Sequence, residues 1–224
     1  MAARAFFLPG IVILFCAFIL SLLVAVSLPA LPALDIVRCH FATDAFTTDG
    51  SMKEIRLMRG HRAYCYYDQT GHRTCIDQGH GYAVNLTTTD SKSVTIGPGA
   101  TRGLAVHPVA AGVTFIALLF SLSSHVTLAL FASLLSFIAA LLTLIAFAID
   151  IALYIIVHDR VQRLQDGQTR SVAAPGVWIT LVSLILLLMA VCTGWFGRRR
   201  SRMAGATDYL PPEKSGAFAM FRRS

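Results

Sequence analysis

Two cysteines in the first half of the chain have a spacing that suits a disulfide. Cys65 and Cys75 flank residues 68–71, Asp-Gln-Thr-Gly, which favour a turn, and the residues on both sides favour β-strands. We therefore predict a β-hairpin closed by a Cys65–Cys75 disulfide, with two free thiols as the alternative. Cys39 is left over, either free or paired with another chain.

A second chemical signal is the triplet Asn85-Leu86-Thr87, which has the pattern of an acceptor for N-linked glycosylation. Such triplets also arise by chance, so an unmodified asparagine is the alternative. Both the sugar and the disulfide require this segment to face an oxidising compartment outside the cytoplasm.

Four histidines, His40, His61, His72 and His80, lie in the same segment. Histidine titrates near neutral pH, so a pH sensor is one interpretation. Scattered histidines in a polar segment are more often plain surface residues, and this is the interpretation that we favour. Their spacings match no compact zinc signature, so we expect no metal site.

Asp150 is an ionisable side chain within a long apolar stretch. Between Arg102 and Arg160 there is no Lys or Arg, and the only acids are Asp150 and Asp159. An ionised carboxylate in such surroundings is costly. No basic residue in the apolar stretches is available to pair with it, so we expect Asp150 to be buried, mostly protonated and structural. The alternative is that its proton carries a pH signal.

The composition indicates where these residues must lie. Of the 224 residues, 55% are hydrophobic and only 14% are charged, and the mean hydropathy is +0.65. A soluble domain is about a quarter charged. The composition therefore excludes an ordinary soluble enzyme, a disordered protein and a secreted disulfide miniprotein, and it indicates an integral membrane protein.

Four apolar stretches are long enough to cross a bilayer, which takes about 20 residues as a helix. The first exceeds the apolar core of a cleavable signal peptide, so we expect a retained anchor. The second and third form a hairpin that turns at residues 121–125, because one helix over both would be about 80 Å long. His107-Pro108 begins the second span, where proline suits the first helical turn. The predicted spans are residues 6–28, 105–122, 126–157 and 172–196.

Basic residues set the predicted orientation. A cluster of arginines follows the last span, and positive residues beside a span favour the cytoplasm. We interpret this cluster and the net charge of +7 as topology signals, not as a nucleic-acid site. The predicted segments are the cytoplasmic N-terminus with the first span (1–28), an extracellular loop (29–104), two spans (105–157), a short extracellular loop (158–171), the fourth span (172–196) and a basic cytoplasmic tail (197–224).

Small residues gather at the start of the second span, where they allow another helix to approach closely. That helix could belong to a partner or to this chain, and the sequence leaves both open. The small residues are Gly103, Ala105, Ala110, Ala111 and Gly112.

Four segments carry a resemblance to a known family: residues 79–82, 101–112, 145–153 and 177–182. With the four spans and the two cysteines of the first outer loop, they resemble the claudin-like tetraspans and, more closely, the fungal PalI family of pH-response regulators. The likeness covers most of residues 5–200. It implies an all-α membrane protein, a four-transmembrane-helix bundle with a small, β-containing, disulfide-bonded first extracellular loop.

The resemblance also implies a function. It points to a plasma-membrane accessory component of ambient, alkaline pH signalling, which assists a seven-span pH sensor upstream of a PacC-type transcription factor. The alternative is a structural tetraspan that organises plasma-membrane domains or cell-wall contacts. The sequence has no HExxH, GxSxG or phosphate-binding glycine loop, so we expect neither enzymatic activity nor a cofactor. The expected partners are the sensor and the lipid bilayer, not nucleic acid, and self-association is left open.

Overall fold

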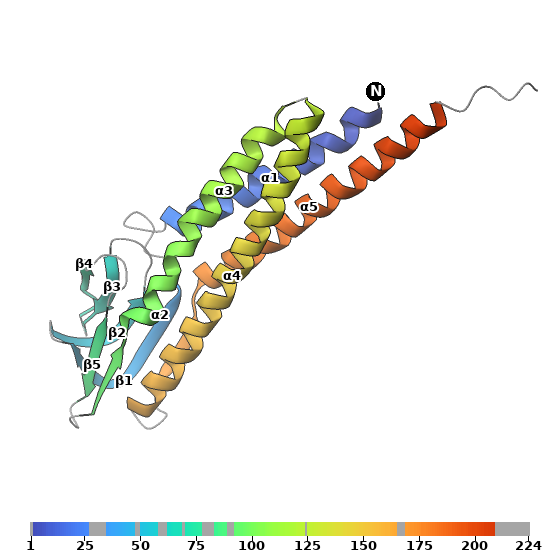
Figure 1. The fold of residues 1–224 in the computed structure, drawn as a ribbon. Coiled ribbons are helices and arrows are strands. Elements are labelled where there is room, and N and C mark those ends of the chain that lie inside the picture. The colour runs from blue at the N-terminus through green and yellow to red at the C-terminus, as the bar shows by residue number, and fades with distance from the viewer. Residues whose placement is uncertain are drawn as a thin grey trace, which may run out of the picture.

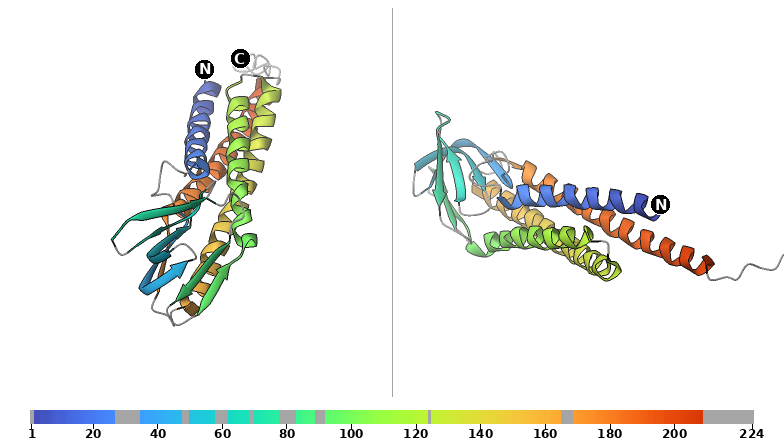
Figure 2. Two further views of the ribbon diagram at one scale, coloured as in Figure 1. Left: turned by 90° about the vertical axis from the view of Figure 1, so that its left-hand side faces the viewer. Right: turned by 90° about the horizontal axis from the view of Figure 1, so that it is seen from above.

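The computed structural model of the chain describes residues 2–26, 35–47, 50–57, 62–68, 70–77, 83–88, 92–123, 125–164 and 169–208. Its helices are α1 (Ala2–Val26), α2 (Pro98–Arg102), the short 3-10 helix η1 (Gly103–Ala105), α3 (Val106–Ser121), α4 (Val126–Leu164) and α5 (Pro175–Asp208). The four long helices form an elongated bundle, and a β-sheet lies at one end of it (Figure 1). The start of α1 and the end of α5 both lie at the opposite end (Figure 2).

In the part of the chain that the structure describes, four helical stretches are long and apolar enough to cross a membrane, in agreement with the four predicted spans. Their mean hydropathies lie between 1.9 and 2.8. A helix suits lipid because it satisfies its own backbone N–H and C=O groups. The stretches are Pro9–Val26, Gly103–Ser121, Thr127–Arg163 and Pro175–Trp195.

Two tryptophans mark the ends of the apolar part of α5. Trp178 and Trp195 are 60% and 67% exposed. Their separation of 17 residues is about 26 Å along a helix, close to the ~30 Å thickness of a hydrocarbon core. Because Trp is enriched at both membrane–water interfaces, the pair indicates a bilayer across this part of α5. The helix continues past its predicted end at residue 196 to Asp208.

α4 is longer than a bilayer is thick, and its end packs against the sheet. The predicted third span ends at residue 157, but the helix continues to Leu164, and its 39 residues measure about 58 Å. Packing stabilises the added turns. Leu153, Val157 and Val161, four residues apart on one face, are at most 1% exposed and belong to the core of the sheet. Burying each of them contributes about 1.5–3 kcal/mol.

Within the described residues the sheet has seven strands, all paired antiparallel, in the order β4-β3-β2-β1-β5-β6, with β7 also paired to β1. The sequence predicts only the β3–β4 hairpin of this sheet. The strands are β1 (Val37–Thr47), β2 (Gly50–Leu57), β3 (Arg62–Tyr67), β4 (Arg73–Asp77), β5 (Val84–Thr88), β6 (Ser93–Ile96) and β7 (Arg170–Ala173).

β7 corrects two predicted boundaries. The sequence predicts a short loop over residues 158–171 and a fourth span from residue 172. In the structure β7 pairs with β1, with Ser171 opposite Cys39, and α5 begins only at Pro175. β1 and β7, more than a hundred residues apart in sequence, therefore share one sheet.

The sheet packs on α4 through one face. Val37, Cys39, Ile55 and Leu57 are at most 1% exposed, because alternate residues of a strand point to the same side. They form one hydrophobic core with the end of α4 and with Leu104 of η1. The sheet and the bundle are thus held together by apolar packing as well as by the chain.

Candidate functional site

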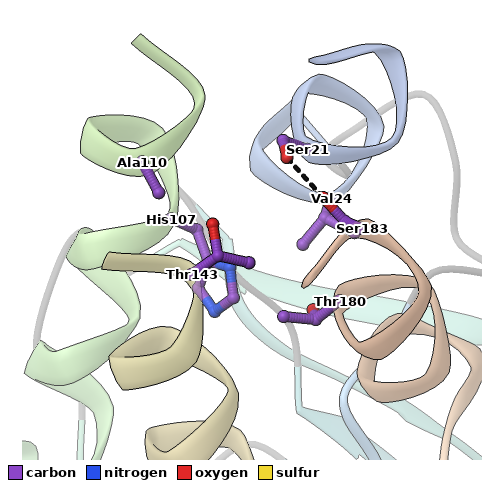
Figure 3. A pocket seen from close by; sticks show the side chains of 7 residues that line it. All are labelled: Ser21, Val24, His107, Ala110, Thr143, Thr180 and Ser183. Carbon is purple, nitrogen blue, oxygen red and sulfur yellow. Dashed lines mark hydrogen bonds between the residues drawn. The ribbon is translucent and has the colours of Figure 1, made fainter. Parts of the chain in front are cut away.

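The half of the bundle nearer the sheet contains a buried polar cluster. Its side chains come from all four long helices and converge on a small cavity, as Figure 3 shows. Buried polar groups are costly in lipid unless they are hydrogen-bonded, so the partners of each group matter. The cavity is lined by Ser21, Val24, His107, Ala110, Thr143, Thr180 and Ser183.

The two ionisable members of this region pair with each other. His107 Nε2 of α3 lies 3.1 Å from Asp150 Oδ1 of α4, and the two side chains are 5% and 0% exposed. The sequence prediction that no basic residue is available for Asp150 is therefore corrected, while its burial is confirmed. The reason for the miss is register. In a simple hairpin, residues at equal distances from the turn between α3 and α4 lie opposite each other. Asp150 is much further from this turn than His107 is, so their sequence positions do not suggest a pair.

A close contact between η1 and α4 brings the pair together. A Cβ atom on Gly103 would lie 2.7 Å from Ile149 Cγ2, a distance that real Cβ atoms essentially never show. Glycine therefore allows the start of the second span to touch α4 one residue before Asp150. His107 follows one helical turn later and lies on the same side of its helix.

The hydroxyl groups of the cluster are hydrogen-bonded. Ser21 Oγ of α1 and Ser183 Oγ of α5 are 2.7 Å apart, which joins two helices that are distant in sequence. Thr143 Oγ1 donates to the carbonyl of Ala139 at 2.8 Å, and Thr180 Oγ1 donates to the carbonyl of Gly176 at 2.9 Å. Hydrogen bonds of the cluster thus join α1 to α5 and α3 to α4, and its hydroxyl groups have partners, as buried polar groups require.

A second group of polar residues lies on the sheet. The carboxylate of Asp35, which is fully buried, accepts hydrogen bonds from Arg38 Nε at 2.9 Å and Nη2 at 3.0 Å. This hydrogen bonding raises the pKa of Arg38. Arg56 Nε lies 2.6 Å from Glu54 Oε1, and its guanidinium lies 4.5 Å from the centre of the Tyr67 ring. The main-chain carbonyl of Asp35 also accepts from Gly176 N at 3.1 Å, which ties this group to α5.

Sequence reasoning missed this group, although alternate charged residues in the strands were an available signal.

The four histidines of the first loop differ in their surroundings. His40 Nδ1 lies 3.4 Å from Glu54 Oε2, so a protonated His40 would form an ion pair there. His72 is exposed, as expected for a surface residue. His61 and His80 lie outside the described residues.

The predicted Cys65–Cys75 disulfide is present in the structure and joins β3 to β4. At the turn between them, Asp68 Oδ1 accepts from Thr70 Oγ1 at 2.6 Å, from Thr70 N at 2.9 Å and from His72 N at 2.8 Å. The hydrogen bond from Thr70 is the main cause of a lowered pKa of Asp68. Gly71 has a φ of 81°, which few other residues adopt.

Cys39 is a free thiol and is completely buried in β1. Burial raises its pKa to about 12. Of the two alternatives left by the sequence, the structure favours a free thiol, since a pair between chains needs an exposed sulfur.

A profile of the SUR7/PalI family matches residues 5–190. The chain belongs to the SUR7/PalI family. The match begins in α1 and ends in α5, so it includes all the strands and the whole polar cluster. A comparison with curated proteins found no match.

Other predicted sites of this SUR7/PalI protein can now be placed. Asn85 lies on the exposed side of β5, where its Oδ1 accepts a hydrogen bond from Thr95 Oγ1 at 2.7 Å. Within the described residues, no group of three His, Cys, Asp or Glu side chains is arranged to hold a metal ion. What the cluster can do is hold the helices together through its hydrogen bonds.

The small residues of the second span divide into two sets. Gly103, Ala110 and Ala111 face the chain's own helices, and both alanines are at most 4% exposed. Ala105 and Gly112 face outward, and a Cβ atom on Gly112 would meet nothing within 4 Å. Packing against the chain's own helices is therefore confirmed for Gly103, Ala110 and Ala111, and contact with a partner stays a prediction for Ala105 and Gly112.

Proposed function

We propose that this SUR7/PalI protein is an accessory component of ambient-pH signalling at the fungal plasma membrane, where it helps a seven-span pH sensor to reach or persist at the cell surface. Its membership of the family is the observation that carries the proposal. The protein acts through binding and not through catalysis. Its described residues offer lipid-facing helices and an outer sheet for such binding.

In this proposal the sheet is extracellular and both termini are cytoplasmic. Three features support the orientation. The disulfide in the sheet suits an oxidising compartment, the arginines at 198–202 lie at the other end of the bundle, and the predicted sugar site at Asn85 is on the sheet. A tag at residue 224 should resist protease on intact cells, and cleavage there would contradict the orientation.

The partner contact is proposed to involve the outward face of α3. Gly112 is exposed and would let another helix approach closely. Gly112→Leu should therefore reduce co-purification with the sensor without changing the level of the protein. Ala148→Leu on α4, another exposed small residue, is the matched control and should leave co-purification unchanged.

A structural role is the second candidate. Both outer loops form one sheet that is packed on the spans, and such a sheet could organise contacts with the cell wall or membrane domains. A deletion strain separates the two functions. Loss of the sensor from the surface and of the alkaline response, with normal membrane domains, supports signalling. Normal sensor level and alkaline response in that strain contradict the signalling function.

A further inference from the structure

The cavity in the polar cluster has the size of one water molecule. A water-sized sphere can reach about 10 Å³ of it, and a cavity needs roughly 10–15 Å³ by this measure to hold a water. Figure 3 shows that His107 lies on one side of the cavity, and Ser21, Thr180 and Ser183 lie on the opposite side. A cavity lined by that many polar groups is one that water enters, whereas an apolar cavity of the same size stays dry.

The hydroxyl groups face this cavity as acceptors. Thr143 and Thr180 each donate their single hydroxyl proton to a carbonyl of their own helix. Ser183 Oγ donates to the carbonyl of Ala17 at 3.3 Å, so the proton between Ser183 and Ser21 comes from Ser21. The hydroxyl protons of these four side chains are therefore all donated to other groups. Each hydroxyl oxygen also has two lone pairs, so it can still accept a hydrogen bond. The cavity therefore requires a ligand that donates hydrogen bonds.

We propose that the cavity binds one water molecule, which donates to hydroxyl oxygens of Thr143 and Thr180 and so bridges α4 and α5. A small cation would also suit oxygen ligands, but the lining contains an imidazole and no carboxylate. Asp150, the nearby acid, is paired with that imidazole. A neutral donor fits this lining better. The bound water joins α4 to α5 between the His107–Asp150 pair and the Ser21–Ser183 pair, and the inference is independent of the proposed function.

Valine variants of the full-length protein in lipid nanodiscs test the proposal. Thr180→Val keeps the shape of the side chain but removes the oxygen. Thr193→Val is the matched control, because exposed Thr193 makes a similar bond to the carbonyl of Ala190 at 2.9 Å. We expect Thr180→Val to lower Tm by about 2–4 °C, the shift for the loss of one buried polar contact in a chain of this length. Thr193→Val should change Tm by less than about 1 °C.

The double variant Thr143→Val/Thr180→Val identifies the shared ligand. If one water bridges both hydroxyls, either single change releases it, so the double variant should melt close to the single ones. Fully additive losses would overturn the proposal. A crystal structure that resolves ordered waters should show one peak in the wild-type cavity and none in Thr180→Val. A wild-type cavity without a peak, or a Tm that rises when choline chloride is replaced by NaCl, would also overturn it.

Discussion

The buried pair of His107 and Asp150 gives the sharpest test of how the bundle is held together. Replacing Asp150 with leucine removes the carboxylate and leaves the imidazole of His107 buried without it. Replacing Asp150 with asparagine keeps the size and a hydrogen-bonding oxygen but removes the ability to titrate. The two variants therefore separate packing and hydrogen bonding from charge.

The structure allows the size of each effect to be estimated. Both side chains are at most 5% exposed, and removing one partner of a buried pair in a soluble protein costs about 3–5 kcal/mol. Interhelical polar contacts in membranes contribute less, about 0.6–1.7 kcal/mol. We expect about 2–4 kcal/mol for Asp150→Leu and about 1 kcal/mol for Asp150→Asn, which correspond to losses in Tm of roughly 4–16 °C and 2–4 °C.

Thermal unfolding of the purified protein measures these losses. Asp159→Asn is the control on the same helix: it breaks an exposed pair with Arg163, which contributes less than about 1 kcal/mol. The double variant His107→Leu/Asp150→Leu should be more stable than the sum of its single changes predicts, because no unpaired group remains. Additive losses, or an Asp150→Leu protein as stable as the wild type, would refute the energetic role of the pair.

The same variants distinguish a structural from a sensing role in cells. Asp150→Asn should reach the cell surface and support the alkaline response, whereas Asp150→Leu should be depleted from the surface. An asparagine variant that reaches the surface normally but no longer responds to pH would show that the proton on this pair is the signal, and the structural interpretation would be wrong.

Three further predictions concern the sheet. Replacing Cys65 and Cys75 together with alanine should lower stability by about 3 kcal/mol, measured by chemical denaturation; an unchanged midpoint would mean that the disulfide contributes nothing. Burial raises the pKa of Cys39 from 9.0 to about 12, so between these pH values only the unfolded thiol ionises. The contribution of Cys39 to the free energy of unfolding should therefore be full below pH 9 and fall as the pH rises toward 12. Cys39→Ala should remove this pH dependence, and a dependence that persists in the variant would belong to another group. Endoglycosidase should shift the protein on gels but not Asn85→Gln, and identical mobilities in every lane would exclude the sugar.

The parts of this fold that the sequence predicts are those set by local composition. An uncharged apolar stretch of about 20 residues predicts a spanning helix, and the strand-forming segments around Asp68 and Gly71 predict a hairpin from local residues alone. These features, including the Cys65–Cys75 disulfide, are present in the structure.

The parts that it does not predict depend on contacts between distant segments. β7 has only four residues, too few to show an alternating pattern, and becomes a strand because β1 lies beside it. α4 continues past residue 157 because Val157 and Val161 pack on the sheet. With Leu153 these residues have the spacing of one helix face, which predicts a longer helix, but the nearby charges of Asp159 and Arg160 obscured this pattern. The partner of Asp150 depends on the register of α3 against α4, which no local pattern determines.

The central structural claim is that both outer loops form one sheet on the oxidising side of the membrane, and a single substitution tests it directly. Ser171→Cys places a second thiol opposite Cys39 across the β1–β7 pair, at a spacing that a disulfide can bridge. We predict that the introduced thiol forms a disulfide with Cys39 in cells, detected by mass spectrometry after thiol blocking, while the thiol of the control Val172→Cys, on the opposite face, remains free. Two blocked, unpaired thiols in the Ser171→Cys protein would contradict both the register and the shared compartment of the two loops.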